Sequence, residues 1–175
     1  MTVHTLSQIP AKRCYTASGI LVHDKKVLLA KHKMLGIWLP PGGHIEPDEL
    51  PHTAAEREFW EETGLKVRTV SHGKMLTDNE TEFLPVPLVA NLHWISESNY
   101  RKRIKGKRVQ VFRGGKTCEQ HVVYVYLVKA INGFAFKRNV EEVEAIGWFG
   151  EKELENLETR EGIKKELVKA FGVTS

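Results

Sequence analysis

Three carboxylates in the middle of the chain are spaced so that they would share one face of a helix. They are Glu58, Glu61 and Glu62, and residues three or four positions apart are neighbours on a helix surface. Like charges this close repel one another, so a protein keeps such a cluster mainly where a cation neutralises it. Hard divalent cations such as Mg²⁺ prefer oxygen ligands and often bridge carboxylates to substrate phosphates. The spacing therefore indicates a site for a divalent cation and a phosphorylated ligand.

These carboxylates belong to a longer pattern, G-x5-E-x7-R-E-U-x-E-E-x-G-U, where U is a bulky aliphatic or aromatic residue. The chain fills every specified position, with Gly43, Glu49, Arg57, Glu58, Phe59, Glu61, Glu62, Gly64 and Leu65. The pattern resembles the signature of the Nudix (MutT-like) hydrolase family. Its seven identities would arise by chance on the order of once in 10⁹ starting positions at ordinary amino-acid usage. Outside the signature, residues 19–33 and 38–43 resemble the first hairpin and the lead-in strand of that family.

The resemblance implies hydrolysis of a diphosphate that links a nucleoside to another moiety, with Mg²⁺ or Mn²⁺ as the cofactor. It implies metal ligation by the helix carboxylates and by the backbone carbonyl of Gly42. It also implies that Glu49 and Arg57 pair and fix the loop onto the helix, next to Gly43. A solvated helix face is the competing interpretation of the carboxylates, and the complete signature disfavours it.

The general base is less sharply indicated than the metal ligands. Glu61 and Glu58 lie on the predicted helix, and many relatives carry a further acid on a distal loop. We rank Glu142 first among the distal acids, which are Glu119, Glu141, Glu142 and Glu144. A base must come within hydrogen-bond reach of the attacking water, which a sequence does not show.

Several other side chains are candidates for substrate binding. Lys31 and His44 stand where relatives often place basic residues that bind phosphate, although a lysine at a strand end and an exposed histidine are the competing interpretations. Four aromatic residues are candidates for stacking on a base, although isolated aromatic residues more often lie in the core. They are Trp38, Phe83, Trp94 and Tyr100.

The order of elements predicts an α/β fold, and the resemblance implies a Nudix-type α/β/α sandwich with a mixed sheet between helices. The predicted strands are 15–23, 26–33, 38–45, 65–76, 86–95, 121–130 and 146–149. A helix is expected from Pro51 to Thr63, with Gly64 as its C-terminal cap. The last helical region is predicted over 151–171, with Thr159 as a cap within it.

Length and composition limit the number of domains, the location of the protein and the state of its cysteines. The chain has 175 residues, which favours a single domain over 1–175. No apolar run approaches the roughly 18 residues that a membrane-spanning helix needs, and the first residues lack the apolar core of a signal peptide, so we expect a cytoplasmic protein without a membrane partner. Cys14 and Cys118 are two cysteines far apart in the sequence, and we expect them to be isolated and reduced.

A strongly basic segment lies early in the second half of the chain. Residues 101–116 contain eight basic and no acidic side chains, which leaves 18 basic and 22 acidic residues in the rest of the chain. We interpret the region around 99–116 as an insertion. It is either a platform for a polyanion such as an RNA 5′ end or, as we favour, a flexible and solvated hairpin.

Three classes of function follow from these patterns. The first is a hydrolase of a small nucleotide such as ADP-ribose, a nucleoside triphosphate or a dinucleoside polyphosphate. The second is an RNA 5′-end pyrophosphohydrolase, and the third is a non-enzymatic nucleotide-binding module, which the intact set of carboxylates disfavours. An isopentenyl diphosphate isomerase is disfavoured because no motif of that kind surrounds either cysteine. A homodimer is compatible with the sequence, which fixes no interface.

Overall fold

The computed structural model describes residues 9–73, 75–111, 116–131 and 133–174. Their contacts divide the chain into two compact units. The larger unit comprises residues 16–90 and 124–175, and the smaller unit comprises residues 1–15 and 91–123. The prediction of a single domain over the whole chain stays a prediction.

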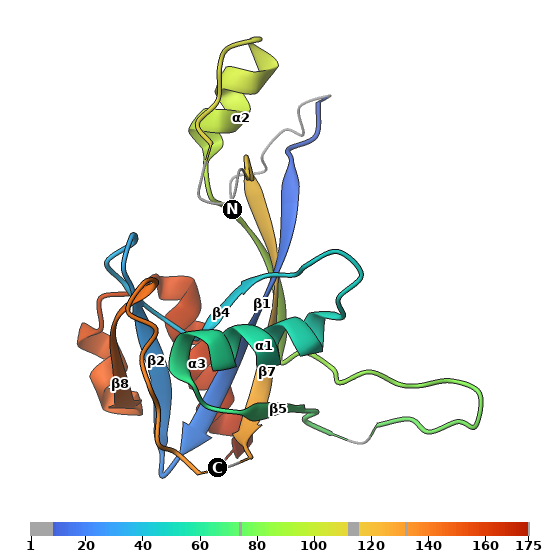
Figure 1. The fold of residues 1–175 in the computed structure, drawn as a ribbon, viewed down its shortest axis with the longest axis vertical. Coiled ribbons are helices and arrows are strands. Elements are labelled where there is room, and N and C mark those ends of the chain that lie inside the picture. The colour runs from blue at the N-terminus through green and yellow to red at the C-terminus, as the bar shows by residue number, and fades with distance from the viewer. Residues whose placement is uncertain (1–8, 74, 112–115, 132, 175) are drawn as a thin grey trace. The chain divides into compact units, whose positions relative to one another are not determined.

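The strands are joined mainly as antiparallel neighbours (Figure 1). The order of the central strands is β3-β2-β1-β7-β5, and β4 pairs with β1, β6 with β7 and β8 with β2. Their bounds are β1 Arg13–His23, β2 Lys26–His32, β3 Trp38–Leu39, β4 Gly42–His44, β5 Val67–Val70, β6 Val89–Trp94, β7 Gln120–Ala130 and β8 Val143–Gly150. A mostly antiparallel sheet with helices confirms the predicted α/β class.

The first hairpin forms as its sequence predicts. Asp24 and Lys25 join β1 to β2, and both have positive φ angles, 47° and 56°. Two consecutive residues with positive φ are the mark of a two-residue hairpin turn whose twist matches that of the strands. The turn fixes the register, so that Val22 faces Val27 across the hairpin.

Helix α1 (Pro51–Thr63) confirms the predicted helix at both ends. Gly64 follows it with a φ of 70°, and its N–H donates to the carbonyl of Trp60 at 2.7 Å. Glycine reaches this left-handed conformation without a Cβ clash. Phe59 is fully buried in a cluster with Leu21, Leu28 and Val128, which packs α1 onto the sheet.

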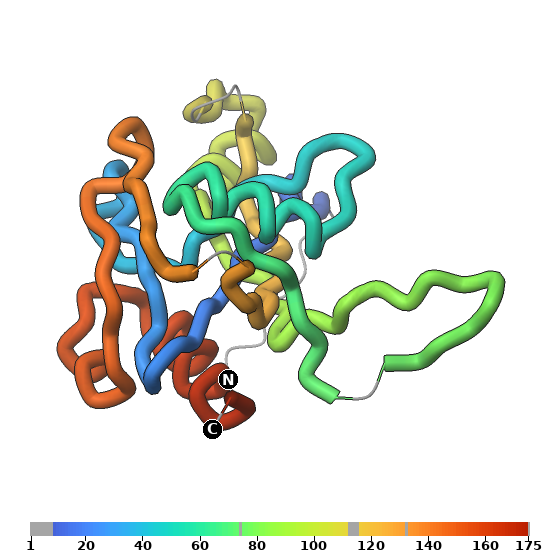
Figure 2. The backbone as a smooth tube through the Cα atoms, turned by 60° about the horizontal axis from the view of Figure 1, so that its bottom comes forward, coloured from blue at the N-terminus to red at the C-terminus, as the bar shows by residue number. Residues whose placement is uncertain are grey.

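The C-terminal region differs from its prediction. In place of one helical stretch over 151–171, the chain forms the 3₁₀ helix η2 (Glu151–Asn156) and then α3 (Glu161–Thr174). Thr159 does not cap α3; its hydroxyl donates to the carbonyl of Trp38 at 2.6 Å, and the Trp38 N–H donates to the carbonyl of Glu158. These bonds to β3 explain why the helix is interrupted. Figures 1 and 2 show α1 and α3 on opposite faces of the sheet.

Two predicted strands also change in the structure. The stretch 38–45 forms β3 and β4, which are separate because Pro40 and Pro41 lie between them and proline cannot donate to a ladder. The predicted strand 65–76 narrows to β5, and an exposed connection follows it toward β6.

The smaller unit contains a helix where the sequence favoured a flexible hairpin. Helix α2 (Glu97–Ile104) begins after Ser96, whose hydroxyl accepts a hydrogen bond from the Asn99 N–H at 3.2 Å. The buried Asn99 amide then exchanges two hydrogen bonds with the backbone of Gln110, which holds the following segment on the helix. The hairpin prediction is therefore wrong for residues 99–104, and its residues 112–115 lie outside the described part of the chain.

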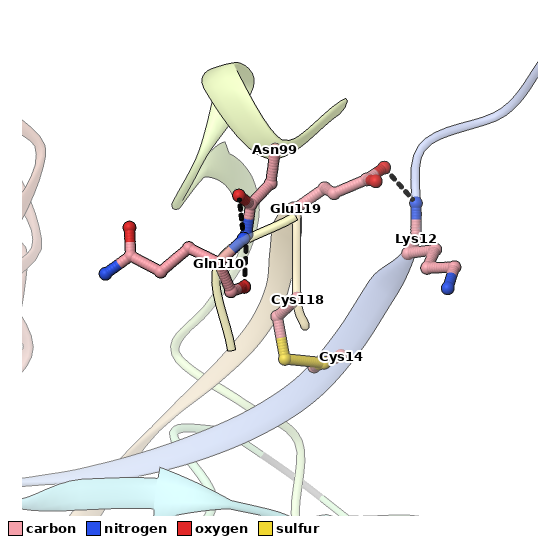
Figure 3. Close-up of a disulfide and its surroundings, with 6 residues drawn as sticks. All are labelled: Lys12, Cys14, Asn99, Gln110, Cys118 and Glu119. Atoms are coloured by element: carbon pink, nitrogen blue, oxygen red, sulfur yellow. Dashed lines mark hydrogen bonds between the residues drawn. A yellow bond between two sulfur atoms is a disulfide. The ribbon is translucent and has the colours of Figure 1, made fainter. Parts of the chain in front are cut away.

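The smaller unit also contains a disulfide between Cys14 and Cys118 (Figure 3). The expectation of two isolated, reduced cysteines is therefore wrong. The two residues are 104 positions apart in the sequence, but their Cα atoms are 5.6 Å apart. The reason is a backbone pairing that no local pattern reveals, since the N–H groups of Glu119 and Gln120 both donate to the carbonyl of Lys12.

Candidate active site

The larger unit brings the glycine turn and the carboxylate helix into direct contact. A side chain at position 43 would place its Cβ 2.5 Å from both carboxylate oxygens of Glu58, and one at position 42 would place it 2.5 Å from the carbonyl oxygen of Ala17. Real Cβ atoms do not approach this closely, so position 42 requires glycine, whereas a side chain at position 43 would displace the Glu58 carboxylate. The two glycines of β4 therefore let the backbone lie directly against the acidic face of α1.

Arg57 links the turn to the helix. Its Nε and Nη2 donate to the two carboxylate oxygens of Glu49 at 2.9 and 3.0 Å, and Nη2 also donates to the carbonyl of His44 at 3.0 Å. Such a two-pronged pair is strong and geometrically specific. It lowers the pKa of the Glu49 carboxyl and raises the pKa of Arg57.

The third nitrogen of Arg57 contacts the helix carboxylates. Nη1 donates to Glu58 at 2.9 Å and to Glu61 at 3.1 Å. One guanidinium is thus shared among three carboxylates. Its single positive charge cannot neutralise all three of their negative charges. Glu62 has no share in it, since no ion pair within the described ranges involves Glu62.

Glu62 lies in the most unfavourable environment of the cluster. Its side chain is almost inaccessible to solvent, with 7% exposed. Burial, with the nearby charges of Glu58 and Glu142, raises its pKa to about 8, against the hydrogen bond from the backbone of Gly42. Burial also raises the pKa of Glu58, against the ion pair with Arg57.

Glu142 is brought to this cluster by a segment that runs along the end of α1. The N–H of Lys137 donates to the carbonyl of Thr63 at 2.7 Å, and the N–H of Asn139 donates to the carbonyl of Glu62 at 3.0 Å. Glu142 follows directly and contributes to the raised pKa values of Glu58 and Glu62. The first-ranked distal acid thus lies beside the carboxylates of α1.

A pocket of about 560 Å³ opens between α1 and this segment. It is lined by Trp60, Glu61, Gly64, Lys137, Arg138, Asn139 and Glu142. Three of these lining residues are not among the predicted site residues: Trp60, Lys137 and Arg138. A usable signal was the basic pair shortly before the acidic run at 141–144. The position of Trp60 between Phe59 and Glu61 in the signature gave no such signal, because that position is unspecified.

The other predicted site residues lie elsewhere. Lys31 on β2 is 3.3 Å from Glu144 and 3.9 Å from Glu158, so ion pairs hold its ammonium group. Glu141 is exposed. Glu119 belongs to the smaller unit, where it is 1% exposed and bound through both oxygens to Arg103, which leaves it unsuited to act as a base.

The four predicted stacking aromatics do not line this pocket. Trp38 packs edge-on against Phe149 at 4.7 Å between ring centroids. Trp94 and Tyr100 contact each other in the smaller unit at 5.3 Å, and Phe83 lies in the connection between β5 and β6. Trp60, which is half exposed, is the aromatic side chain that the pocket presents.

The donor set fits a hard divalent cation. Two carboxylates with raised pKa values, Glu58 and Glu62, are buried together, and the guanidinium of Arg57 is divided among several carboxylates. An ion with oxygen ligands would neutralise this excess of negative charge. The backbone of Gly42 also lies within hydrogen-bond reach of Glu62.

Comparisons with known proteins agree with this geometry. A family model described as the NUDIX domain matches residues 13–171. The chain is 39% identical over 59 residues to a MutT-like protein of Streptomyces ambofaciens, covering 33% of this chain and 38% of the relative. It is 43% identical over 49 residues to the m7GpppN-mRNA hydrolase NUDT17 of Bos taurus, covering 25% of this chain and 16% of the relative.

A solved structure extends the likeness to nearly the whole chain. It is the crystal structure of a NUDIX-family hydrolase from Clostridium perfringens, with a TM-score of 0.71 and 25% identity. The match covers 94% of this chain and 99% of that one. The chain spans well under half of the length of the two curated relatives above.

Proposed function

Because the chain belongs to the Nudix family, we propose that it hydrolyses the diphosphate bond of a nucleoside diphosphate linked to another moiety, with the help of a divalent cation. The observation that carries this proposal is the carboxylate cluster of α1, which is buried without full neutralisation. It lies beside a pocket that also presents two cationic side chains, Lys137 and Arg138. A diphosphate offers the negative charge that such cations and a metal ion bind.

The carboxylates Glu58, Glu61 and Glu62, with the carbonyl of Gly42, would hold the cation, Mg²⁺ or Mn²⁺. When bound, such an ion neutralises phosphate oxygens and acidifies water. Arg57 positions the helix carboxylates relative to the glycine turn through its bonds to Glu49 and His44. No geometric argument for substrate binding follows for Lys31 and His44, whose predicted contact with phosphate stays a prediction.

Glu142 is our candidate for the general base. It lines the pocket with Glu61 and is close enough to the carboxylates of α1 to affect their pKa values. A base in this position would take the proton of the water that attacks phosphorus. Glu61 is the alternative, and it also contacts Arg57.

The pocket favours a small nucleotide as the substrate. Its volume of about 560 Å³ lies within the range of about 300–1,000 Å³ that is typical of small-molecule sites. The half-exposed ring of Trp60 offers a surface for a base, while Lys137 and Arg138 offer charge for phosphates. ADP-ribose, nucleoside triphosphates and dinucleoside polyphosphates all combine these groups.

Hydrolysis of a nucleotide panel with Mg²⁺ or Mn²⁺ tests the proposal. The panel includes the three small-nucleotide classes and a 5′-triphosphorylated RNA, and released phosphate is measured with a coupled phosphatase where needed. We expect cleavage of at least one small nucleotide, which chelation or Glu61→Gln abolishes. Glu142→Gln should lower kcat far more than the matched change Glu141→Gln, because only Glu142 lines the pocket. Activity that survives chelation would contradict the proposal.

The second candidate is a hydrolase that acts on RNA 5′ ends. Lys102, Lys105, Lys107 and Arg108 are exposed on and after α2, and the NUDT17 relative is named an mRNA hydrolase. Such a surface would bind phosphates in a salt-dependent way. Activity confined to the RNA of the panel, with a steep loss at higher salt, would favour this function over the first. Metal binding with no cleavage of any member would favour a binding module.

Location and assembly are further proposals. No helix within the described residues has both the length and the apolar character to cross a membrane. We expect a cytoplasmic protein, and the disulfide makes this testable because such bonds are rare in a reducing cytosol. Thiol labelling of the chain from cells measures its redox state, and sedimentation measures whether it dimerises.

A further inference from the structure

The smaller unit gathers two sulfur ligands and one nitrogen ligand at a single point. The ligand atoms of Cys14, Cys118 and His121 all lie within 4.8 Å of one another. Cys118 is 2% exposed, and the other two residues are half-buried. All three belong to the same compact unit, and none takes part in the chemistry proposed above.

The framework around these residues does not depend on the disulfide alone (Figure 3). The Lys12 N–H donates to the Glu119 carboxylate at 2.8 Å, and the Glu119 N–H donates back to the Lys12 carbonyl at 3.0 Å. These residues flank Cys14 and Cys118, respectively. Nε and Nη2 of Arg103 donate to the two oxygens of the same carboxylate at 2.5 and 2.8 Å, and Nη2 also donates to the carbonyl of Pro10. The two sulfur-bearing segments are therefore held together by bonds that reduction would leave in place.

We propose that Cys14, Cys118 and His121 form a zinc site when the cysteines are reduced. Zinc binds thiolates at about 2.3 Å and imidazole nitrogen at about 2.0–2.1 Å, so tetrahedral ligand atoms are roughly 3.6–3.8 Å apart. The ligand atoms of the three residues are already within 4.8 Å of one another, so only a local opening of the sulfur pair is needed. Two thiolates, one neutral imidazole and Zn²⁺ carry no net charge, which suits a largely buried site.

This site differs in kind from the carboxylate cluster of α1. Thiolates are soft ligands that select zinc, whereas carboxylates suit Mg²⁺ and Mn²⁺. The smaller unit supplies three of the four ligands that a tetrahedral zinc ion takes. The disulfide and the zinc complex exclude each other because both use the same sulfur atoms.

Reduction of the disulfide and binding of zinc are two separate steps. An external dithiol gives two electrons to the bond between Cys14 and Cys118, which breaks; the dithiol becomes a disulfide, and its two protons pass to the protein thiols. Zinc binding then releases both thiol protons to solvent. Oxidation by a small disulfide reverses the sequence and releases the metal.

Cobalt titration of the reduced, full-length protein tests the proposal. Co²⁺ replaces zinc in such sites, and a thiolate-to-cobalt charge-transfer band reports sulfur ligation, which the carboxylate cluster cannot produce. We expect the band to saturate at one equivalent, to disappear on addition of zinc and to be absent from the oxidised protein. Cys14→Ser and Cys118→Ser should each weaken the band strongly.

His121→Gln is the decisive variant because it leaves both sulfurs in place. We expect it to weaken cobalt binding by more than the roughly 10–100-fold that loss of an outer-shell partner costs. The matched change His72→Gln, at an exposed histidine of the larger unit, should leave binding unchanged. Circular dichroism monitors folding of each variant. A reduced chain without the band, an unchanged affinity in His121→Gln, or equal binding by the denatured chain would each overturn the proposal.

Discussion

Two buried carboxylates, one in each compact unit, have opposite surroundings. Glu119 of the smaller unit is 1% exposed, and the guanidinium of Arg103 and the Lys12 N–H hold its pKa below the ordinary value. Glu62 of the larger unit is 7% exposed, and burial among like charges raises its pKa to about 8. Two side chains that are both almost inaccessible to solvent therefore have pKa shifts of opposite sign, with desolvation the largest cause for Glu62 and the hydrogen bonds from Arg103 the largest cause for Glu119.

The difference lies in how each arginine is used. Arg103 gives two nitrogens to a single carboxylate, so the charge of Glu119 is matched within the protein. Arg57 is divided among Glu49, Glu58 and Glu61, and Glu62 is left out. A carboxylate whose charge is neutralised by an arginine links two segments of the chain. A buried carboxylate without such a partner is suited to bind a cation. Each prediction below tests this contrast.

The largest expected effect is on catalysis. Glu62→Gln keeps the shape of the side chain but removes one anionic metal ligand, so we expect kcat/KM to fall by about 10³-fold, which corresponds to about 4 kcal/mol. Glu119→Gln should change kcat/KM by less than about threefold at a temperature where the variant is folded. Steady-state kinetics on the substrate found in the panel measures both values. Equal losses in the two variants would remove the distinction between the carboxylates.

Substitution of the two arginines should distinguish a role in catalysis from a role in stability. Arg57→Ala frees the glycine turn from α1 and misplaces the carboxylates, so we expect kcat to fall by about 10²-fold. Arg103→Ala should leave kcat nearly unchanged and act on stability instead. A smaller effect of Arg57→Ala on kcat than of Arg103→Ala, in folded protein, would show that we have assigned the arginines wrongly.

The stability effect of Arg103→Ala should be substantial. It leaves Glu119 buried without its partner, which costs about 3–5 kcal/mol for a buried pair. For a chain of this size, about 1 kcal/mol shifts Tm by roughly 2–4 °C, so we expect a fall of about 10 °C, measured by calorimetry. Arg101→Ala is the matched control because its pair with Glu97 is exposed to solvent, and exposed ion pairs contribute little to stability. Similar melting temperatures for the two variants would contradict a structural role for Glu119.

The last prediction concerns the pH dependence of stability without metal. The folded-state pKa of Glu62 is about 8, against an ordinary value of 4.5, so the folded chain binds more protons than the unfolded chain between these values. The stabilisation from the protonated Glu62 is full below about pH 4.5 and is lost as the pH rises toward 8. In the presence of a chelator, we therefore expect Tm to fall as the pH rises through this window.

Glu62→Gln should flatten that decline, since an amide does not titrate. It should also raise the Tm of the metal-free protein at pH 8 above that of the natural chain. Glu119→Gln should not flatten the decline, because the pKa of Glu119 is lowered and its titration lies below this window. Parallel pH profiles for the natural chain and Glu62→Gln would show that Glu62 is already ionised in the folded protein.

Much of the larger unit was predictable because its signals are local. The i, i+3, i+4 spacing identified the helix face, Pro51 and Gly64 marked the ends of α1, and Asp24-Lys25 marked the first hairpin. Helix α2 was missed because its basic composition was interpreted only as charge, although Ser96 offered an N-cap. The periodic pattern from Glu161 indicated where the last helix begins, but the hydrogen bonds of residues 158–159 to Trp38 gave no signal, because these residues are distant in the sequence.

The sequence by itself determined the family signature, the carboxylates and the turn glycines, because their chemistry needs fixed spacing along a single helix and its lead-in. Tertiary structure decided which charges are matched. It buried Glu62, brought Glu142 and the pair Lys137-Arg138 to the end of α1, and joined Cys14 to Cys118. The physical reason is that burial and pairing depend on contacts between segments far apart in the chain. Two glutamates of the same chemistry thus acquire opposite pKa shifts only when the chain folds.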